Sequence, residues 1–284
     1  MSRVEEILNI ANHIPPFPKV AMQVMKMLED PKVQAKDLAE VIQYDSAITA
    51  NLLKTCNAAY FGLPRKVSSL DEALVLIGQD ALKDIIIASS SARFYKGKAG
   101  GEGYQLEQGD LWKHSVATAI MAKSISRHFK GIEPGTAFTT GLLHDIGKRF
   151  LSSFVAGDFK KIMDRTHNDG LSFMEAEHEI LGMGHAELGS LIMQRWEFPE
   201  DMIQAVKLHH DPQALSKDPL TALVAMANTL VISIGVGVGA DGLSGAMQGE
   251  GLKRFGITTL EIDRYMSNLL LEMERAEEMM TLSD

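Results

Sequence analysis

The sequence predicts an all-α fold: a bundle of about five short helices over residues 1–100, packed on a second helical domain over residues 104–284. Apolar residues recur every three or four positions through most of the chain, which is the period of an amphipathic helix. No strand-like alternation of any length occurs in the first hundred residues. The glycine-rich stretch of residues 96–103, KGKAGGEG, is the most linker-like part of the chain, so we place the domain boundary there.

The first helix is expected over residues 4–11, before the proline-rich segment IPPFP at residues 14–18 forces the chain into an extended path. Further helices are expected over residues 20–28, 38–42, 47–59, 70–77 and 81–94. Asp45 and Ser46 can cap the third of these, and Ser68 or Ser69 the fourth. Gly78 is expected to separate the last two.

Composition limits the classes of partner. The chain has 284 residues, of which 45% are hydrophobic and 23% charged, as in a globular protein, and its net charge is -9. This acidity argues against a surface for nucleic acid or anionic lipid, so we expect protein or small-molecule partners. The single cysteine, Cys56, lies among apolar residues and fits a buried thiol in a reducing cytoplasm. Residues 222–240 are interrupted by polar residues and glycines, so we interpret them as a buried helix with a glycine-rich loop, without a membrane span.

Imidazole and carboxylate groups recur at the ends of the predicted helices of the second domain. Asp110 and His114 are four residues apart and share one helix face. The adjacent pair His144 and Asp145 follows a small-residue helix over residues 136–143, at an end that we expect to be exposed. Three further histidines lie at helix ends, namely His185, His209 and His210. Residues 158–166 and 173–181 are expected to supply bulk and no chemistry.

Each of these residues alone has a simpler explanation, because single histidines are commonly packed in cores or solvated, and Asp110 could merely cap its helix. Five histidines with neighbouring carboxylates are harder to explain by packing, since several buried imidazoles without a cation would be costly to leave unpaired. The set as a whole therefore favours a divalent transition-metal site.

Four segments of the chain resemble the HDOD family, the HD-related output domains of bacterial signalling proteins. They are IPPFP at residues 14–18, DSAIT at 45–49, LLKTCNAAYFG at 52–62 and VSSLDEALVLIG at 67–78. The chain departs from the family by having Asp45-Ser46 in place of Asp-Pro and Asn57-Ala58-Ala59 in place of Asn-Ser-Ala. The resemblance implies a helical bundle packed on an HD-like domain, in a protein that acts on a partner.

The order His, His-Asp, His, His-His resembles the HD metal-dependent phosphohydrolase superfamily, and within it the HD-GYP branch. This resemblance implies a metal-ligand set of Asp110, His114, His144, Asp145, His185, His209 and His210, with Lys148 as the lysine that follows the His-Asp motif. Asn228 occupies the position of the last aspartate of the family and brings no charge. Residues 211–219, DPQALSKDP, replace the glycine-tyrosine-proline loop that helps the branch bind cyclic di-GMP.

Two functions follow. The first is a regulatory protein of the HDOD type with a retained metal site, which binds a signalling protein or a small phosphorylated ligand. The alternative is a metal-dependent phosphohydrolase acting on phosphomonoesters or nucleotides, in which Asp145 bridges the ions or holds the nucleophile and Lys148 offsets charge on the phosphoryl oxygens. The missing loop disfavours cyclic di-GMP as substrate. For either function we expect one or two ions, iron before manganese, zinc or nickel, because the ligands are imidazoles and carboxylates without a thiolate.

Overall fold

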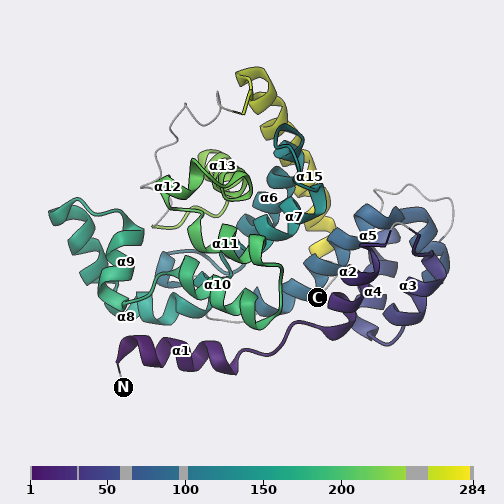
Figure 1. Ribbon diagram of the computed structural model, residues 1–284, viewed down its shortest axis with the longest axis horizontal. Helices are drawn as coiled ribbons and strands as arrows, with labels where there is room; N and C mark the ends of the chain where they lie inside the picture. The colour runs from purple at the N-terminus through teal and green to yellow at the C-terminus, as the bar shows by residue number, and fades with distance from the viewer. Residues whose placement is uncertain (1, 31, 58–65, 96–101, 241–254, 282–284) are drawn as a thin grey trace. The chain divides into compact units, whose positions relative to one another are not determined.

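The computed structural model describes residues 2–30, 32–57, 66–95, 102–240 and 255–281 (Figure 1). Within these ranges the chain forms helices and connecting turns, without a strand, so the predicted all-α fold is confirmed. Most of the expected linker, residues 96–101, and the last two residues of the helix expected over residues 47–59 lie outside the described residues.

The chain divides into two compact units. One comprises residues 1–15 and 94–269, and the other comprises residues 16–93 and 270–284. The helix α1 (Arg3–His13) belongs to the former, because it packs on α8 (Ile146–Asp169) and α10 (His185–Arg195). The expected division near residue 100 assigned this helix to the bundle that follows it in sequence. The proline-rich segment that follows α1 allows this difference, because it separates the helix from its sequence neighbours.

In the other unit, the described part of residues 16–93 contains four helices. They are α2 (Lys19–Met27), α3 (Ala35–Ile42), α4 (Ser46–Cys56) and α5 (Leu70–Tyr95), the last of which continues into the other unit. The predicted caps are present: the Asp45 carboxylate accepts hydrogen bonds from the first backbone N–H groups of α4, and the Ser69 hydroxyl accepts one from Glu72. Gly78 has non-helical torsion angles and divides α5, as predicted.

Cys56 is buried against Val67 and Ala73 in the core of this unit. Burial raises the pKa of its thiol to about 11, and the buried position that the sequence predicts is confirmed.

Among the described residues, the unit that contains the predicted ligands has the larger number of helices. Besides α1, α8 and α10, these are α6 (Asp110–Ile125), α7 (Pro134–Leu143), α9 (Phe173–Leu181), α11 (Glu200–Leu208), α12 (Pro212–Leu215) and α13 (Pro219–Ser233), with the 3-10 turns η2 (Glu102–Tyr104) and η3 (Ser126–His128) and the start of α15 (Thr259–Thr281). The helix α6 packs along α7, and α13 packs on both of them as well as on α11.

The apolar run of residues 222–240 forms most of α13 and the turn after it, and nearly all of the helix is buried, as predicted. None of the helices among the described residues has the length and apolarity that a bilayer crossing requires. The helix α7 ends just before the His-Asp pair and α8 begins just after it, while His209, which follows the end of α11, lies near Asp145.

Candidate metal centre

The His-Asp pair lies in the tight junction between two helices. The helix α7 ends at Leu143 and α8 begins at Ile146, so His144 and Asp145 occupy the turn that joins them. Both side chains are fully buried, which corrects the expectation of an exposed helix end. The reason is tertiary, because α10 packs on α8 while α11 and α13 pack on α7 and cover the junction.

Four of the histidines that the sequence singles out lie at this junction, and in each of them Nδ1 makes a hydrogen bond. In each, Nδ1 faces an oxygen that can only accept a hydrogen bond, so Nδ1 carries the proton and donates it, and Nε2 keeps its lone pair. The pairs are His114 with Val236 O at 3.0 Å, His144 with Gly141 O at 2.7 Å, His185 with Glu177 Oε2 at 2.9 Å and His209 with Val206 O at 2.6 Å.

The four Nε2 atoms converge on the carboxylate of Asp145. On one side Oδ2 lies 3.2 Å from His144 Nε2 and 3.6 Å from His114 Nε2. On the other side Oδ1 lies 3.4 Å from His185 Nε2 and 3.7 Å from His209 Nε2. The Nε2 lone pairs and the negatively charged carboxylate repel each other unless a cation lies between them. The arrangement therefore has the form of a ligand set.

A fifth imidazole completes one side of the cluster. His210 Nε2 lies 3.3 Å from His185 Nε2, and His210 is partly exposed whereas the other four histidines are buried. Ligand atoms within 4.8 Å of one another form two groups, both of which contain Asp145. One group adds His185, His209 and His210 to Asp145, and the other adds His114 and His144.

Protons on His114 and His209 do not supply the missing positive charge. Burial lowers the pKa of His114 to about 4, and burial together with His144 holds the pKa of His209 well below its usual range. Burial would raise the pKa of the Asp145 carboxyl, but His144 and Lys148 hold it well below the usual range. The Asp145 carboxylate thus lies beside neutral imidazoles at His114 and His209, and the cluster could hold a transition-metal ion.

Several buried polar atoms at the centre have no hydrogen-bond partner among the described residues. They are His114 Nε2, His144 Nε2, His209 Nε2 and Asp145 Oδ1. Unpaired buried polar atoms are rare in folded proteins and call for an explanation. Bonds to a metal ion would satisfy the imidazole and carboxylate atoms of this set.

Lys148, which the resemblance to the HD superfamily pairs with the His-Asp motif, lies one turn into α8. Its ammonium donates a hydrogen bond of 2.6 Å to Asp145 Oδ2, and its side chain is almost fully buried. The same ammonium lies 5.7 Å from the centre of the Tyr104 ring. One oxygen of the central carboxylate is therefore already shared with a fixed positive charge.

The structure does not bring Asp110 into the cluster. Its carboxylate turns back along the chain, where Oδ2 accepts a hydrogen bond of 3.0 Å from the backbone N–H of Glu107. Asp110 is the first residue of α6, so the simpler role of a residue at a helix start is the one that the geometry shows. Asn228 is buried on α13, which packs on α6, α7 and α11.

Glu177 and Tyr104 belong to the site although sequence reasoning missed them. Glu177 is fully buried on α9, accepts the His185 Nδ1 hydrogen bond and also accepts one from the Tyr104 hydroxyl. A signal was available: Phe173, Glu177 and Leu181 are spaced four residues apart and share the buried face of α9, where an isolated carboxylate is unusual.

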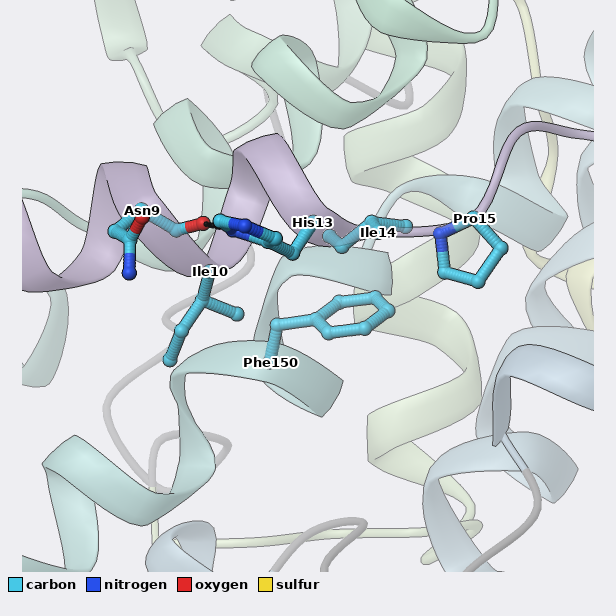
Figure 2. Close-up of a pocket in the computed structure, with 6 residues that line it drawn as sticks. All are labelled: Asn9, Ile10, His13, Ile14, Pro15 and Phe150. Atoms are coloured by element: carbon cyan, nitrogen blue, oxygen red, sulfur yellow. Dashed lines mark hydrogen bonds between the residues drawn. The ribbon is translucent and has the colours of Figure 1, made fainter.

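A separate hollow of about 310 Å³ lies at α1, away from the cluster, and none of the predicted ligands lines it. Figure 2 shows Phe150 of α8 opposite the apolar side chains of Ile10 and Ile14. The lining residues are Asn9, Ile10, His13, Ile14, Pro15 and Phe150. With three aliphatic or proline side chains and one aromatic ring, this hollow offers little chemistry.

These observations define a helical protein with a buried cluster of histidines around one aspartate, which could hold a metal ion. A sequence model of the HDOD domain matches residues 14–212, and the chain belongs to this family.

Similar proteins agree with this assignment. An uncharacterized protein of Treponema pallidum (strain Nichols) is 26% identical over 222 residues, which are 77% of this chain and 42% of that protein, so the chain spans less than half the length of that relative. The structure of an HDOD domain protein of unknown function from Geobacter sulfurreducens has a TM-score of 0.73 at 25% identity, over 97% of this chain and 98% of the other. A proposed phosphohydrolase of Shewanella amazonensis SB2B has a TM-score of 0.71 at 21% identity over 98% of both chains, which shows a shared fold.

Proposed function

We propose that this protein is a metal-binding regulatory member of the HDOD family, which acts by binding a signalling protein or a small phosphorylated ligand in the cytoplasm. The observation that carries the proposal is the set of four imidazoles whose Nδ1 atoms are engaged and whose Nε2 lone pairs face one buried carboxylate. Such a set can serve as a metal-ligand shell, and without a cation its buried, unpaired polar atoms would destabilise the fold.

The ligand atoms suit one or two divalent transition ions. His185, His209, His210 and Asp145 would hold one ion, and His114, His144 and Asp145 would hold the other. Imidazoles and a carboxylate without a thiolate favour iron, with manganese, zinc and nickel as alternatives. When bound, an ion supplies a Lewis acid that neutralises the Asp145 charge and polarises an oxygen ligand.

Three observations favour binding over turnover. Apart from the partly exposed His210, the histidines and Asp145 are at most 3% exposed, which leaves little surface for a phosphate ester. The last family ligand is the neutral Asn228, so the centre has one anionic ligand, Asp145, among the residues that the structure brings together. After the His-His pair, the short helix α12, capped by Asp211, occupies the place of the substrate loop of the HD-GYP branch.

Metal analysis of the purified protein tests the site. We expect roughly one equivalent or more of transition metal in the wild type, and loss of most of it in His144→Ala and Asp145→Ala, because each removes a buried ligand. His167→Ala is the matched control, since His167 lies at the exposed far end of α8 and its Nδ1 bonds only Met163 O. A metal-free wild type, or equal metal content in wild type and Asp145→Ala, would refute the metal centre.

The phosphohydrolase alternative rests on one specific observation, the buried ammonium of Lys148 beside Asp145. In that function Lys148 would offset charge that develops on the phosphoryl oxygens, and Asp145 would hold the nucleophile in place.

Hydrolysis of a panel of phosphomonoesters, nucleotides and cyclic dinucleotides with added manganese or iron decides between the two functions. We expect Asp145→Asn and wild type to give equal background rates on every substrate while the wild type retains its metal. Turnover that depends on both Asp145 and Lys148 would overturn the regulatory proposal and establish the alternative.

A further inference from the structure

The two oxygens of Asp145 face different surroundings. Oδ1 has no hydrogen-bond partner among the described residues, and it faces His185 and His209. Oδ2 accepts the short hydrogen bond from the Lys148 ammonium. An ion that binds Oδ2 must therefore compete with this hydrogen bond, whereas an ion that binds Oδ1 does not.

The two sides of the carboxylate also differ in the number of ligands, and the Oδ1 side has more. The group around Oδ1 contains three imidazoles and the carboxylate, so four residues could hold an ion there. The group around Oδ2 contains two imidazoles and the carboxylate.

His185 is also held differently from the other histidines of the cluster. The Nδ1 atoms of His114, His144 and His209 donate to neutral backbone carbonyl oxygens, whereas His185 Nδ1 donates to the carboxylate of Glu177. The same Glu177 oxygen accepts a hydrogen bond of 2.7 Å from the His185 backbone N–H, so the ring and the main chain of His185 are both fixed by one group. A carboxylate behind an imidazole makes the imidazole a more basic metal ligand and fixes its orientation.

Glu177 itself indicates a cation beyond His185. Its carboxylate is fully buried and accepts hydrogen bonds from the Tyr104 hydroxyl, the His185 backbone N–H and the His185 ring. A buried carboxylate is costly unless a positive charge lies near it. A metal ion on Nε2 of the same ring would offset that charge through the imidazole.

We propose that the two halves of the metal centre are unequal, with the first and tighter ion held by Asp145 Oδ1, His185, His209 and His210. Glu177 is the positioning residue that strengthens this half, supported by Tyr104. The Oδ2 half, which Lys148 shares, binds a second ion more weakly. This inference rests on the proposed metal binding and adds which half is filled first and which residues decide it.

Titration of the metal-free full-length protein with Co²⁺, followed by calorimetry and by the visible spectrum of the bound ion, tests the proposal. Glu177→Gln keeps an oxygen acceptor for His185 but removes the charge, so affinity for the first ion should fall about 10–100-fold and the spectrum should shift. Glu179→Gln is the matched control, because Glu179 lies on the same helix and its exposed side chain pairs with Arg165. The control should bind like wild type.

Ligand variants identify the half that fills first. His210→Ala should weaken the first binding event, whereas His114→Ala should spare it and weaken or remove the second. Lys148→Met should tighten the second event, because it frees Asp145 Oδ2 and removes the nearby charge. If His114→Ala weakened the first event as much as His210→Ala did, the assignment would be overturned.

The outcomes separate this inference from the function on which it rests. A wild type that binds no Co²⁺ overturns the metal centre itself. A wild type that binds Co²⁺ while Glu177→Gln and Glu179→Gln bind equally well overturns only the role of Glu177. Tyr104→Phe provides a second variant if Glu177→Gln does not fold, since it removes one hydroxyl, and it should weaken the first ion to a smaller extent. An unchanged first affinity in Tyr104→Phe would then contradict the role of the pair.

Discussion

The substitution Gly147→Ala tests the packing that brings His185 beside Asp145. Gly147 lies in the first turn of α8, directly against the backbone of α10. A Cβ atom at this position would lie 1.9 Å from the carbonyl oxygen of His185 and 2.8 Å from the backbone nitrogen of Gly189. Since ordinary contact begins at 3.4 Å, α10 would have to move away by about 1.5 Å.

The atoms in the way belong to the backbone, so no side chain can rotate to make room. Overpacking of this kind typically costs about 1–3 kcal/mol of unfolding free energy. The displacement acts on His185, the first residue of α10, so metal content should fall together with stability. Both effects follow from one contact between two helices.

Gly157→Ala on the same helix is the control, because nothing lies within 4 Å of the Cβ that it would add. Alanine favours a helix over glycine by about 1 kcal/mol, so this variant should be slightly more stable than wild type. Urea unfolding of the metal-free proteins, followed by far-UV circular dichroism, should separate the two variants by about 2–4 kcal/mol. If Gly147→Ala were as stable as Gly157→Ala and kept its metal, the close approach of α8 and α10 would be refuted.

Two further predictions concern the metal-free protein. Burial lowers the pKa of His114 from 6.5 to about 4, so between these pH values the folded state binds fewer protons than the unfolded chain. The unfolding free energy should therefore fall by about 3 kcal/mol for this residue as the pH drops from 6.5 toward 4. An unfolding free energy independent of pH would contradict this prediction. Tyr95→Phe removes the hydroxyl that donates a 3.0 Å hydrogen bond to the Leu142 carbonyl, which should cost about 1–3 kcal/mol in urea unfolding, whereas Tyr44→Phe, at an 82% exposed tyrosine, should change nothing measurable.

Local features of the fold were predictable because their causes lie within a few residues. The period of apolar residues predicts the helices, Asp45 caps α4 through backbone groups two and three residues away, and Gly78 interrupts α5 by its own torsion angles. The burial of α13 follows from its composition. Each of these depends on the sequence near it and not on how the helices cross.

The sequence by itself determined that the chain is helical, that it carries the HDOD pattern and that His114, His144, Asp145, His185, His209 and His210 are the residues to examine. Only the tertiary structure decided that Asp110 turns to its own backbone and that Glu177, from a helix that seemed to supply only bulk, supports His185. The spacing of residues along one helix shows which side chains share a face. The groups that this face meets depend on the helices packed against it, and at this centre those helices come from segments more than a hundred residues apart, as the hydrogen bond between His114 and Val236 shows.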